Sequence, residues 1–540
     1  MRLLNKLVLF TLLGASVGTL TSCDNDLEAI NVNNNNPEIV PTSTIFNGAN
    51  RYLMNYTRDG WWSARMSLPW MQYSSQNNYL EEDKYQYRDT QTNNGWTYLY
   101  RSANNFKDII DRVENPETAV QMSAYGNLQN QIAASRIMLA YTFDNLVTHF
   151  GDVPYWSYGQ KDNPRFQALQ IETYTVPAYA TQEEIYADLL KELKEAADQI
   201  VVGEIVFTAG DNIYNGDAAK WKKFANSLRL RIANRLKEKM PAAQSHINEA
   251  IAGGVFTSNA DTAAHRFGSA DAEGNPFWKL FYVDNRTDFY VNQTFIELLK
   301  GETGSYGLDP RLFKIAAPKG LTFTQFQDVT NWYKPIDDNG YGLVEGNLDD
   351  YTGMPYGQPS VDTFYGASAN INFFSHDYMK INKPEVLMEY SEVEFILSEL
   401  NGWSQANYEA GVRANMEYWG VAASDIDAYI ANLPAATQEH VLNQKYIALL
   451  NNADEAWNEY RRTGYPNTSI LLMPGETNTR PNGTTYTFTP LISGNVVATD
   501  LPGRVRYPTK QQTLNRTNWL EASSRLSNGD EINSKLYFAR

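Results

Sequence analysis

Apolar residues recur at helical spacing in both halves of this chain, and this pattern constrains the fold more than any other feature. Between residues 119 and 150 they occupy more than one helical face, which is typical of a helix buried on several sides. Thr181 and Glu184 have the spacing of a capping box, and a one-sided apolar stripe follows as far as Ile200. A further stripe runs along residues 218–239, and the opposite helical face carries Lys223, Arg231 and Lys237.

The C-terminal half repeats the pattern. Apolar stripes over 386–400 and 442–457 predict two helices, and residues 405–432 predict two shorter ones between them. Helix pairs joined by short turns indicate stacked helical hairpins, as in tetratricopeptide-type solenoids, although the tetratricopeptide signature itself is absent. We therefore expect a mostly α fold, with helical hairpins mainly in 92–252 and 384–462.

The middle of the chain is different in composition. From about 255 to 380 it is rich in Gly, Asn, Asp, Tyr and Pro, and residues 464–510 are similar, with short strand-like runs. Such segments predict long irregular loops over the helical scaffold, with a few short strands. Because binding residues often lie in ordered loops on a rigid frame, we expect ligand or partner contacts mainly in 58–90 and 255–380.

Residues 1–22 have the features of an export signal. Arg2 and Lys6 precede an uncharged apolar stretch that is too short to span a bilayer, and small residues lead into Cys23. This ending resembles a bacterial lipobox, in which the cysteine receives a diacylglycerol and further acyl chains such as palmitate. Cys23 is also the single cysteine of the chain, so disulfides and thiolate metal sites are excluded. The alternative is a secreted protein with an incidental cysteine at its cleavage site.

The Asn-rich residues 23–41 predict a lipidated cysteine followed by a flexible tether, and residues 42–540 predict a single binding domain. The formal net charge of −17 argues against nucleic acid as a partner and against electrostatic attachment to anionic lipid. Acidic residues directly after the cysteine resemble the signal that sends some Bacteroidetes lipoproteins to the cell surface; they are Asp24, Asp26 and Glu28.

Catalytic and metal-binding motifs are not evident. The chain has no GxSxG, HExxH, Walker A or GxGxxG motif, and its five histidines lack metal-ligand spacing. We therefore predict no catalytic residue, no metal site and no cofactor. A glycosidase pair of carboxylates that meet only in space stays open. The run from Asp337 to Gly340 faintly resembles a calcium loop, but a solvated turn explains it better because the EF-hand spacing is missing.

Aromatic residues cluster with amide side chains in three places. Aromatic faces stack on the apolar face of a sugar ring, while Asn and Gln hydrogen-bond its hydroxyls, so these clusters are candidates for carbohydrate recognition. The alternative is that the rings fill the core or face a protein partner. The candidate ligand-binding residues are Trp61, Trp62, Trp70, Gln72, Tyr73, Asn77, Asn78, Trp278, Tyr282, Asn285, Arg286, Trp332 and Tyr333. The cluster that begins at Trp61 and ends at Tyr79 is the first choice.

Several segments, in order along the chain, resemble the SusD/RagB family of nutrient-binding outer-membrane lipoproteins, and in particular its SusD-like branch. None of these motifs is specific alone, but their order is. They are the segments 149–155 (HFGDVPY), 181–200, 219–229 (AKWKKFANSLR), 309–312 (DPRL), 444–449 (QKYIAL), 455–457 (EAW), 461–466 (RRTGYP) and 506–508 (RYP).

The resemblance implies a helical fold with four tetratricopeptide-type hairpins and long loops. It further implies a non-catalytic, lipid-anchored protein on the extracellular face of the outer membrane. Its partner would be a SusC-like TonB-dependent outer-membrane transporter, over which it acts as a lid during capture of an oligosaccharide, or sometimes a peptide. A surface glycoside hydrolase and a purely structural partner of the transporter are the alternatives. The family's binding residues vary, so none is transferred to this chain.

Overall fold

The helix α8 (Leu128–Phe150) lies at the centre of the helical scaffold, and almost every one of its side chains is buried. It begins at Asn127, whose side chain accepts a hydrogen bond from the backbone N–H of Asn130, and it ends at Gly151. Burial on several faces explains why its apolar residues do not form a single stripe. The computed structural model describes residues 40–86, 88–327, 347–362, 364–365, 370–492 and 498–540.

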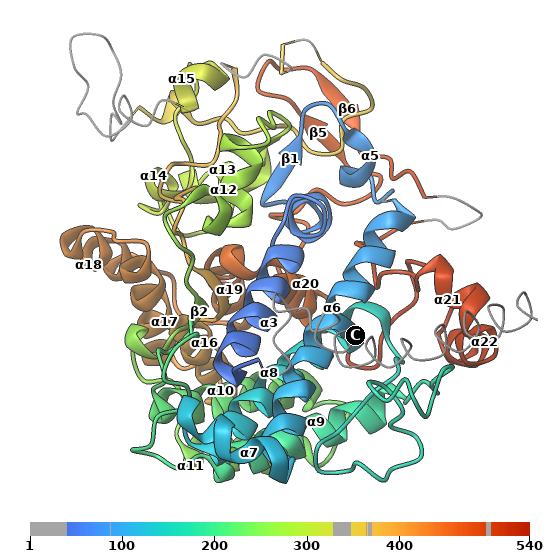
Figure 1. Ribbon diagram of the computed structural model, residues 1–540. Helices are drawn as coiled ribbons and strands as arrows, with labels where there is room; N and C mark the ends of the chain where they lie inside the picture. The colour runs from blue at the N-terminus through green and yellow to red at the C-terminus, as the bar shows by residue number, and fades with distance from the viewer. Residues whose placement is uncertain (1–39, 87, 328–346, 363, 366–369, 493–497) are drawn as a thin grey trace, which may run out of the picture. The chain divides into compact units, whose positions relative to one another are not determined.

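Antiparallel helices pack around α8 and continue through the C-terminal half, which confirms the mostly α fold (Figure 1). In the N-terminal half these helices are α3 (Thr42–Thr57), α6 (Asp89–Glu114), α7 (Pro116–Met122), α9 (Gln182–Gln199), α10 (Ala218–Leu236) and α11 (Ala243–Gly253). In the C-terminal half they are α16 (Tyr390–Leu400), α17 (Gln405–Tyr418), α18 (Ala423–Ala431), α19 (Gln438–Ala448) and α20 (Ala453–Thr463), with α21 (Thr509–Leu514) and α22 (Arg516–Ser524) near the end of the chain.

Two local predictions can be compared with these elements. The capping box at Thr181 and Glu184 is confirmed, because each side chain bonds the backbone N–H of the other. The predicted helix over 386–400 is wrong at its start: residues 385–388 form a strand, and α16 begins at Tyr390. A short buried apolar run suits either structure, and pairing with a distant strand decides between them.

The described residues include three two-stranded antiparallel sheets, and two of them join segments that lie far apart in the sequence. They pair β1 (Ser74–Gln76) with β3 (Phe289–Val291), β2 (Ala263–His265) with β4 (Glu385–Met388), and β5 (Thr477–Thr479) with β6 (Thr485–Thr487). The first of these sheets brings the N-terminal aromatic segment beside the segment that follows residue 282.

Short helices occur within the loop-rich parts of the chain. Figure 1 shows them together with β1, β5 and β6 at the end of the helical scaffold away from α7 and α11. They include η1 (Ser63–Ser67), α4 (Leu68–Trp70), α5 (Leu80–Asp83), α12 (Pro276–Tyr282), α13 (Gln293–Lys300), α14 (Leu312–Ile315) and α15 (Phe323–Gln327). The sequence pattern did not predict α12, because a seven-residue helix is too short to show a periodic stripe.

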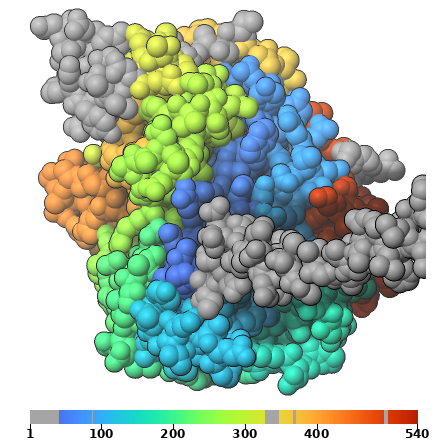
Figure 2. Space-filling model, viewed as in Figure 1, coloured from blue at the N-terminus to red at the C-terminus, as the bar shows by residue number. Residues whose placement is uncertain are grey.

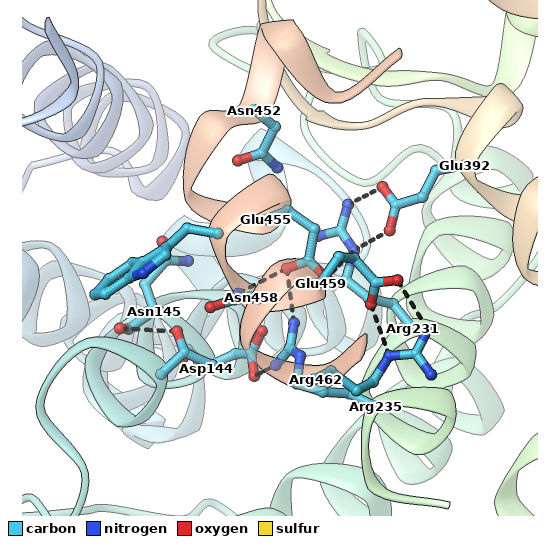
Figure 3. A network of polar contacts seen from close by, with 12 residues as sticks. Asp144, Asn145, Arg231, Arg235, Glu392, Asn452, Glu455, Asn458, Glu459 and Arg462 are labelled. Atoms are coloured by element: carbon cyan, nitrogen blue, oxygen red, sulfur yellow. Dashed lines mark hydrogen bonds and ion pairs between the residues drawn. The ribbon is translucent and has the colours of Figure 1, made fainter. Parts of the chain in front are cut away.

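A buried network of ion pairs connects helices from both halves of the chain (Figure 3). Arg235 of α10 binds Asp144 of α8 at 2.7 Å and Glu455 of α20 at 2.7 Å. Glu399 of α16 receives Arg462 of α20 at 2.7 Å. Further members of the network are Arg231, Lys237, Glu392, Lys445 and Glu459. The basic face of α10 is therefore covered by other helices and neutralised by their carboxylates.

Residues Thr42–Arg540 form one compact unit, and residues 1–41 are grouped apart from it. Nearly all the buried apolar side chains of the described residues belong to one continuous core. Within the described part of the chain, no helix has the length and apolar character that crossing a membrane requires. The lipobox cysteine, Cys23, lies outside the described residues.

Candidate functional site

The pairing of β1 with β3 brings two of the three predicted aromatic clusters together. Ser74 lies opposite Val291 and Gln76 opposite Phe289, so the segment after Trp61 runs beside the segment after Arg286. The space-filling view shows the corresponding blue and yellow-green parts of the surface in contact on one face (Figure 2). The site is thus assembled from two segments more than 200 residues apart.

Two exposed aromatic rings flank a pair of guanidinium groups at this junction. Trp61 is 47% exposed and Tyr79 is 40% exposed. The guanidinium carbon of Arg65 lies 4.8 Å from the Trp61 ring centre and 5.0 Å from that of Tyr79, and the corresponding distances from Arg286 are 5.9 and 5.5 Å. Cation–π contacts of this kind orient both rings. We call these four residues the Trp61–Arg286 site.

Carboxylates hold the two arginines in place. Arg65 is buried and contacts Glu82 at 3.3 Å and Asp288 at 3.4 Å, while Arg286 binds the same oxygen of Asp288. Burial lowers the pKa of Arg65, although Glu82 opposes this shift. The guanidinium of Arg286 is only partly buried, so its remaining N–H groups can reach a ligand. The site therefore offers two rings and a fixed hydrogen-bond donor side by side.

A pocket of about 250 Å³ adjoins the Trp61–Arg286 site, and Trp61 forms part of its wall. Two tyrosines extend the aromatic surface here: the rings of Tyr56 and Tyr98 stack with centres 3.6 Å apart. Tyr52 contacts both of these rings. The pocket is lined by Tyr56, Asp59, Trp61, Trp62, Gln91, Asn94, Gly95 and Tyr98. A side chain at position 95 would collide with the Trp62 ring, so Gly95 allows α6 to approach this ring closely.

Asp59 is the acidic residue of this pocket. Its Oδ1 accepts hydrogen bonds from the backbone N–H groups of Trp61 and Trp62, at 2.9 and 2.7 Å. These bonds fix the turn that presents the Trp61 ring. Burial raises the pKa of Asp59 to about 6, and the two backbone donors offset only part of this effect.

Several predicted ligand residues lie in the core instead of on the surface. Trp70 packs edge-to-face on Trp457, and Tyr73 stacks on Tyr446 with ring centres 4.6 Å apart. Gln72 bonds the backbone of Leu472. Trp62 and Asn77 are also buried. Since these side chains have almost no accessible surface, none of them belongs to the Trp61–Arg286 site, and the aromatic-rich sequence reflects packing at these positions.

The remaining predicted residues are at least partly accessible. Trp278 and Tyr282 stack along α12 with ring centres 5.6 Å apart, and the Tyr282 hydroxyl contacts His376 Nδ1 at 2.6 Å. Asn285 is exposed and accepts a hydrogen bond from Gln327. Asn78 is exposed next to Tyr79. Trp332 and Tyr333, like the run from residue 337 to 340, lie outside the described residues.

Sequence reasoning missed five residues of this surface: Tyr52, Tyr56, Asp59, Arg65 and Tyr98. One signal was available for two of them. Tyr52 and Tyr56 are four residues apart in α3, a spacing that places them on the same helical face. No comparable signal marked Asp59 or Arg65, because a single charged residue among apolar ones is compatible with many roles.

A model of a protein family matches residues 34–489 of the chain, and the family is described as SusD-like, starch-binding and associating with the outer membrane. This match covers most of the chain. The protein belongs to the SusD-like family. None of the curated proteins compared with the chain matches it.

Solved structures of a chitin-binding protein and of SusD-like proteins have the same fold. A chitin-binding protein is 26% identical, with a TM-score of 0.67 over 91% of this chain and 99% of the other. A SusD-like protein from Bacteroidetes is 23% identical, with a TM-score of 0.68 over 93% of this chain and 100% of the other. A SusD homologue from Parabacteroides distasonis is 21% identical, with a TM-score of 0.69 over 92% and 98% of the two chains.

Membership of the SusD-like family confirms the resemblance derived from the sequence motifs. It also accounts for the order of the helical hairpins, since matching structures cover more than nine-tenths of the chain. The Trp61–Arg286 site lies within the matched residues 34–489. Its position is nevertheless argued only from the contacts of this SusD-like chain.

Proposed function

We propose that the protein binds oligosaccharides, without catalysis, at the Trp61–Arg286 site. The observation that carries this proposal is the fixed arrangement of two exposed rings around paired guanidiniums. Each ring lies against both guanidiniums and is still 40–47% exposed, which leaves surface for stacking on a sugar, and Arg286 can donate to hydroxyls. Because the rings are already held in place, little conformational entropy is lost when a ligand binds.

Chitin-type and starch-type glycans are the first candidates as ligands. The family description names starch, and one solved structure with 26% identity is a chitin-binding protein. Both polymers present apolar pyranose faces at regular intervals, which suits rings at fixed positions. Peptide ligands have no comparable repeated face, so they are the weaker candidate for this site.

The same proposal includes the cellular location of the protein and its partner. Acylation of Cys23 would anchor it to the outer membrane, on the extracellular face, and residues 24–41 would serve as the tether. The protein would then act as the lid of a SusC-like TonB-dependent transporter and deliver captured glycan for import. Support comes from the lipobox pattern in the sequence and from the family's association with the outer membrane.

Calorimetric titration tests the binding proposal. A soluble form that begins after Cys23 is titrated with chito-, malto- and cello-oligosaccharides and with oligopeptides, beside the variants Trp61→Ala and Phe364→Ala. We expect saturable binding of at least one glycan class, weakened roughly tenfold by Trp61→Ala, which corresponds to about 1.4 kcal/mol, because this change removes a stacking surface. Phe364 is an exposed ring whose contacts are with Asp362, Tyr365 and Asn370 and not with the Trp61–Arg286 site, so it serves as the matched control and should have no effect.

The outcomes separate the proposal from its alternatives. Glycan binding that is insensitive to Trp61→Ala would contradict the location of the site. Release of shorter sugars during prolonged incubation would instead support a glycoside hydrolase. Co-purification with the transporter, combined with no affinity for any glycan or peptide, would support a structural role.

A further inference from the structure

The pocket beside Trp61 combines aromatic walls with one acidic group. Rings of Tyr56, Trp61 and Tyr98 line it, and the polar side chains of Gln91 and Asn94 complete the lining around Asp59. We call this cavity the Asp59 pocket. It opens beside the Trp61–Arg286 site and shares the Trp61 ring with it, so a ligand stacked on Trp61 lies next to the pocket.

Asp59 lacks a cationic partner. Glu82 and Asp288, the carboxylates that hold the arginines of the Trp61–Arg286 site, each form ion pairs with arginine. Asp59 forms no ion pair with any described residue, and its Oδ2 accepts no hydrogen bond from them. The upward shift of its pKa to about 6 has burial as its main cause, and the opposing contributions come from backbone N–H groups and not from a cation. A largely buried carboxylate without an ion-pair partner is stabilised strongly in its charged form when a ligand supplies a cation.

Aromatic rings around a carboxylate form a recognised type of site for ammonium groups, because the ring faces attract the cation while the carboxylate pairs with it. We propose that the Asp59 pocket receives the protonated amino group of a glucosamine unit in the bound glycan. This inference rests on the proposed function and specifies the substrate class of that same site. The glycan backbone stacks on Trp61, and its 2-amino group reaches Asp59 Oδ2.

The chemistry of the pocket distinguishes among sugars that differ only at carbon 2. A hydroxyl donates one neutral hydrogen bond to the carboxylate, and an acetamide donates one through its N–H. An ammonium group donates up to three hydrogen bonds and also neutralises the buried charge. A volume of about 250 Å³ admits any of the three, so the discrimination arises from charge and not from size.

A matched series of ligands tests the inference. Hexamers of β-1,4-linked glucose, N-acetylglucosamine and glucosamine have the same backbone and differ at carbon 2. Their affinities are measured by calorimetry at pH 6.5, where Asp59 is mostly ionised, for the native protein and for Asp59→Asn, Tyr98→Leu and Glu117→Gln. Asparagine keeps the oxygen that fixes the turn, and Glu117 is an exposed acidic residue of α7 that controls for general attraction to an acidic surface.

We expect the glucosamine hexamer to bind at least tenfold more tightly than the N-acetylglucosamine hexamer. Asp59→Asn should abolish this preference while changing the affinity for the N-acetylglucosamine hexamer less than threefold. Tyr98→Leu removes an aromatic ring and no charge, and it should also reduce the preference for the glucosamine hexamer. Glu117→Gln should leave it intact.

Three results would overturn the inference. They are equal affinity for the glucosamine and N-acetylglucosamine hexamers, a preference that survives Asp59→Asn, and a trilysine peptide that binds as tightly as the glucosamine hexamer and is lost in Asp59→Asn. If the glucosamine hexamer fails to bind while another glycan binds in a Trp61-dependent manner, only this inference fails. If no glycan binds at all, the proposed function fails with it.

Discussion

At the scale of single residues, neighbouring positions in this chain have opposite roles. Trp61 is 47% exposed, whereas Trp62 is only 3% exposed and contacts His149 of α8. Nothing in the sequence separates the two tryptophans. The hydrogen bonds of Asp59 to both backbone N–H groups set the turn that directs one ring outward and the other inward. The exposed ring is thus a consequence of a single acidic side chain.

The ionisation of Asp59 should affect stability in an unusual direction. Its pKa in the folded protein is about 6 and its ordinary value is 3.8, so the folded state binds the proton more tightly. Stability is therefore lost as the pH rises through this window. We expect Asp59→Asn to raise the midpoint of thermal unfolding at pH 7.5 and to change it little at pH 4. A lower midpoint at pH 7.5 would show that the charged carboxylate stabilises the turn.

The limits of sequence-based prediction are also clearest at this scale. Trp70 and Tyr73 were candidates for ligand contact, but they pack against Trp457 and Tyr446. Their partners are more than 370 residues away, and no local pattern reveals a contact of that range. Trp61 and Trp62 of the Asp59 pocket were candidates, but its other residues were missed for the same reason, because α3 and α6 contribute to the pocket together with the turn at Trp61.

At the scale of secondary-structure elements, long helices were predictable and short elements were not. Stripes, caps and terminal glycines are local signals, and they located α9, α10, α17 and α18. The strand β4 and the helix α12 depend on tertiary contacts, which override weak local preference. The basic face of α10 shows a further limit, since the sequence does not reveal that carboxylates of α16 and α20 cover it.

The capping box of α9 permits a test at this scale. The Thr181 hydroxyl accepts the backbone N–H of Glu184, and the Glu184 carboxylate accepts the backbone N–H of Thr181 in return. Thr181→Ala removes the first bond and should lower the free energy of unfolding by about 1 kcal/mol. Thr181→Ser keeps a hydroxyl and should cost only a small part of this. Urea unfolding measures the free energy of unfolding of both variants. An equal decrease in the two variants would contradict a capping role.

At the scale of the whole compact unit, ion pairs join the N-terminal and C-terminal halves. Glu399 of α16 contacts Lys237 of α10 and Arg462 of α20, at 2.8 and 2.7 Å. Burial alone would raise the pKa of Glu399, but Arg462 and Lys237 outweigh it and lower the pKa to about 2. The fold was foreseeable from helical stripes and ordered motifs, whereas this connection between its halves was not.

Acid should weaken this connection. Because the folded pKa of Glu399 is depressed, its contribution to stability is present above about pH 4.5 and is lost as the pH falls toward 2. Glu399→Gln should therefore lower the free energy of unfolding by about 3 kcal/mol at pH 7, and the difference from the native protein should shrink below pH 3. Urea unfolding at a series of pH values measures it. A difference that stays constant down to pH 2.5 would exclude the ionised carboxylate as the cause.

The buried network has an electrostatic consequence outside the protein. Its acidic members are Asp144, Glu392, Glu399, Glu455 and Glu459, and its basic members are Arg231, Arg235, Lys237, Lys445 and Arg462. These charges cancel, so the net charge of −17 arises from the rest of the chain. The resulting negative field extends into solvent over about one Debye length. A polycation diffusing toward the protein would bind faster at low ionic strength, whereas a neutral glycan would arrive at a rate independent of salt.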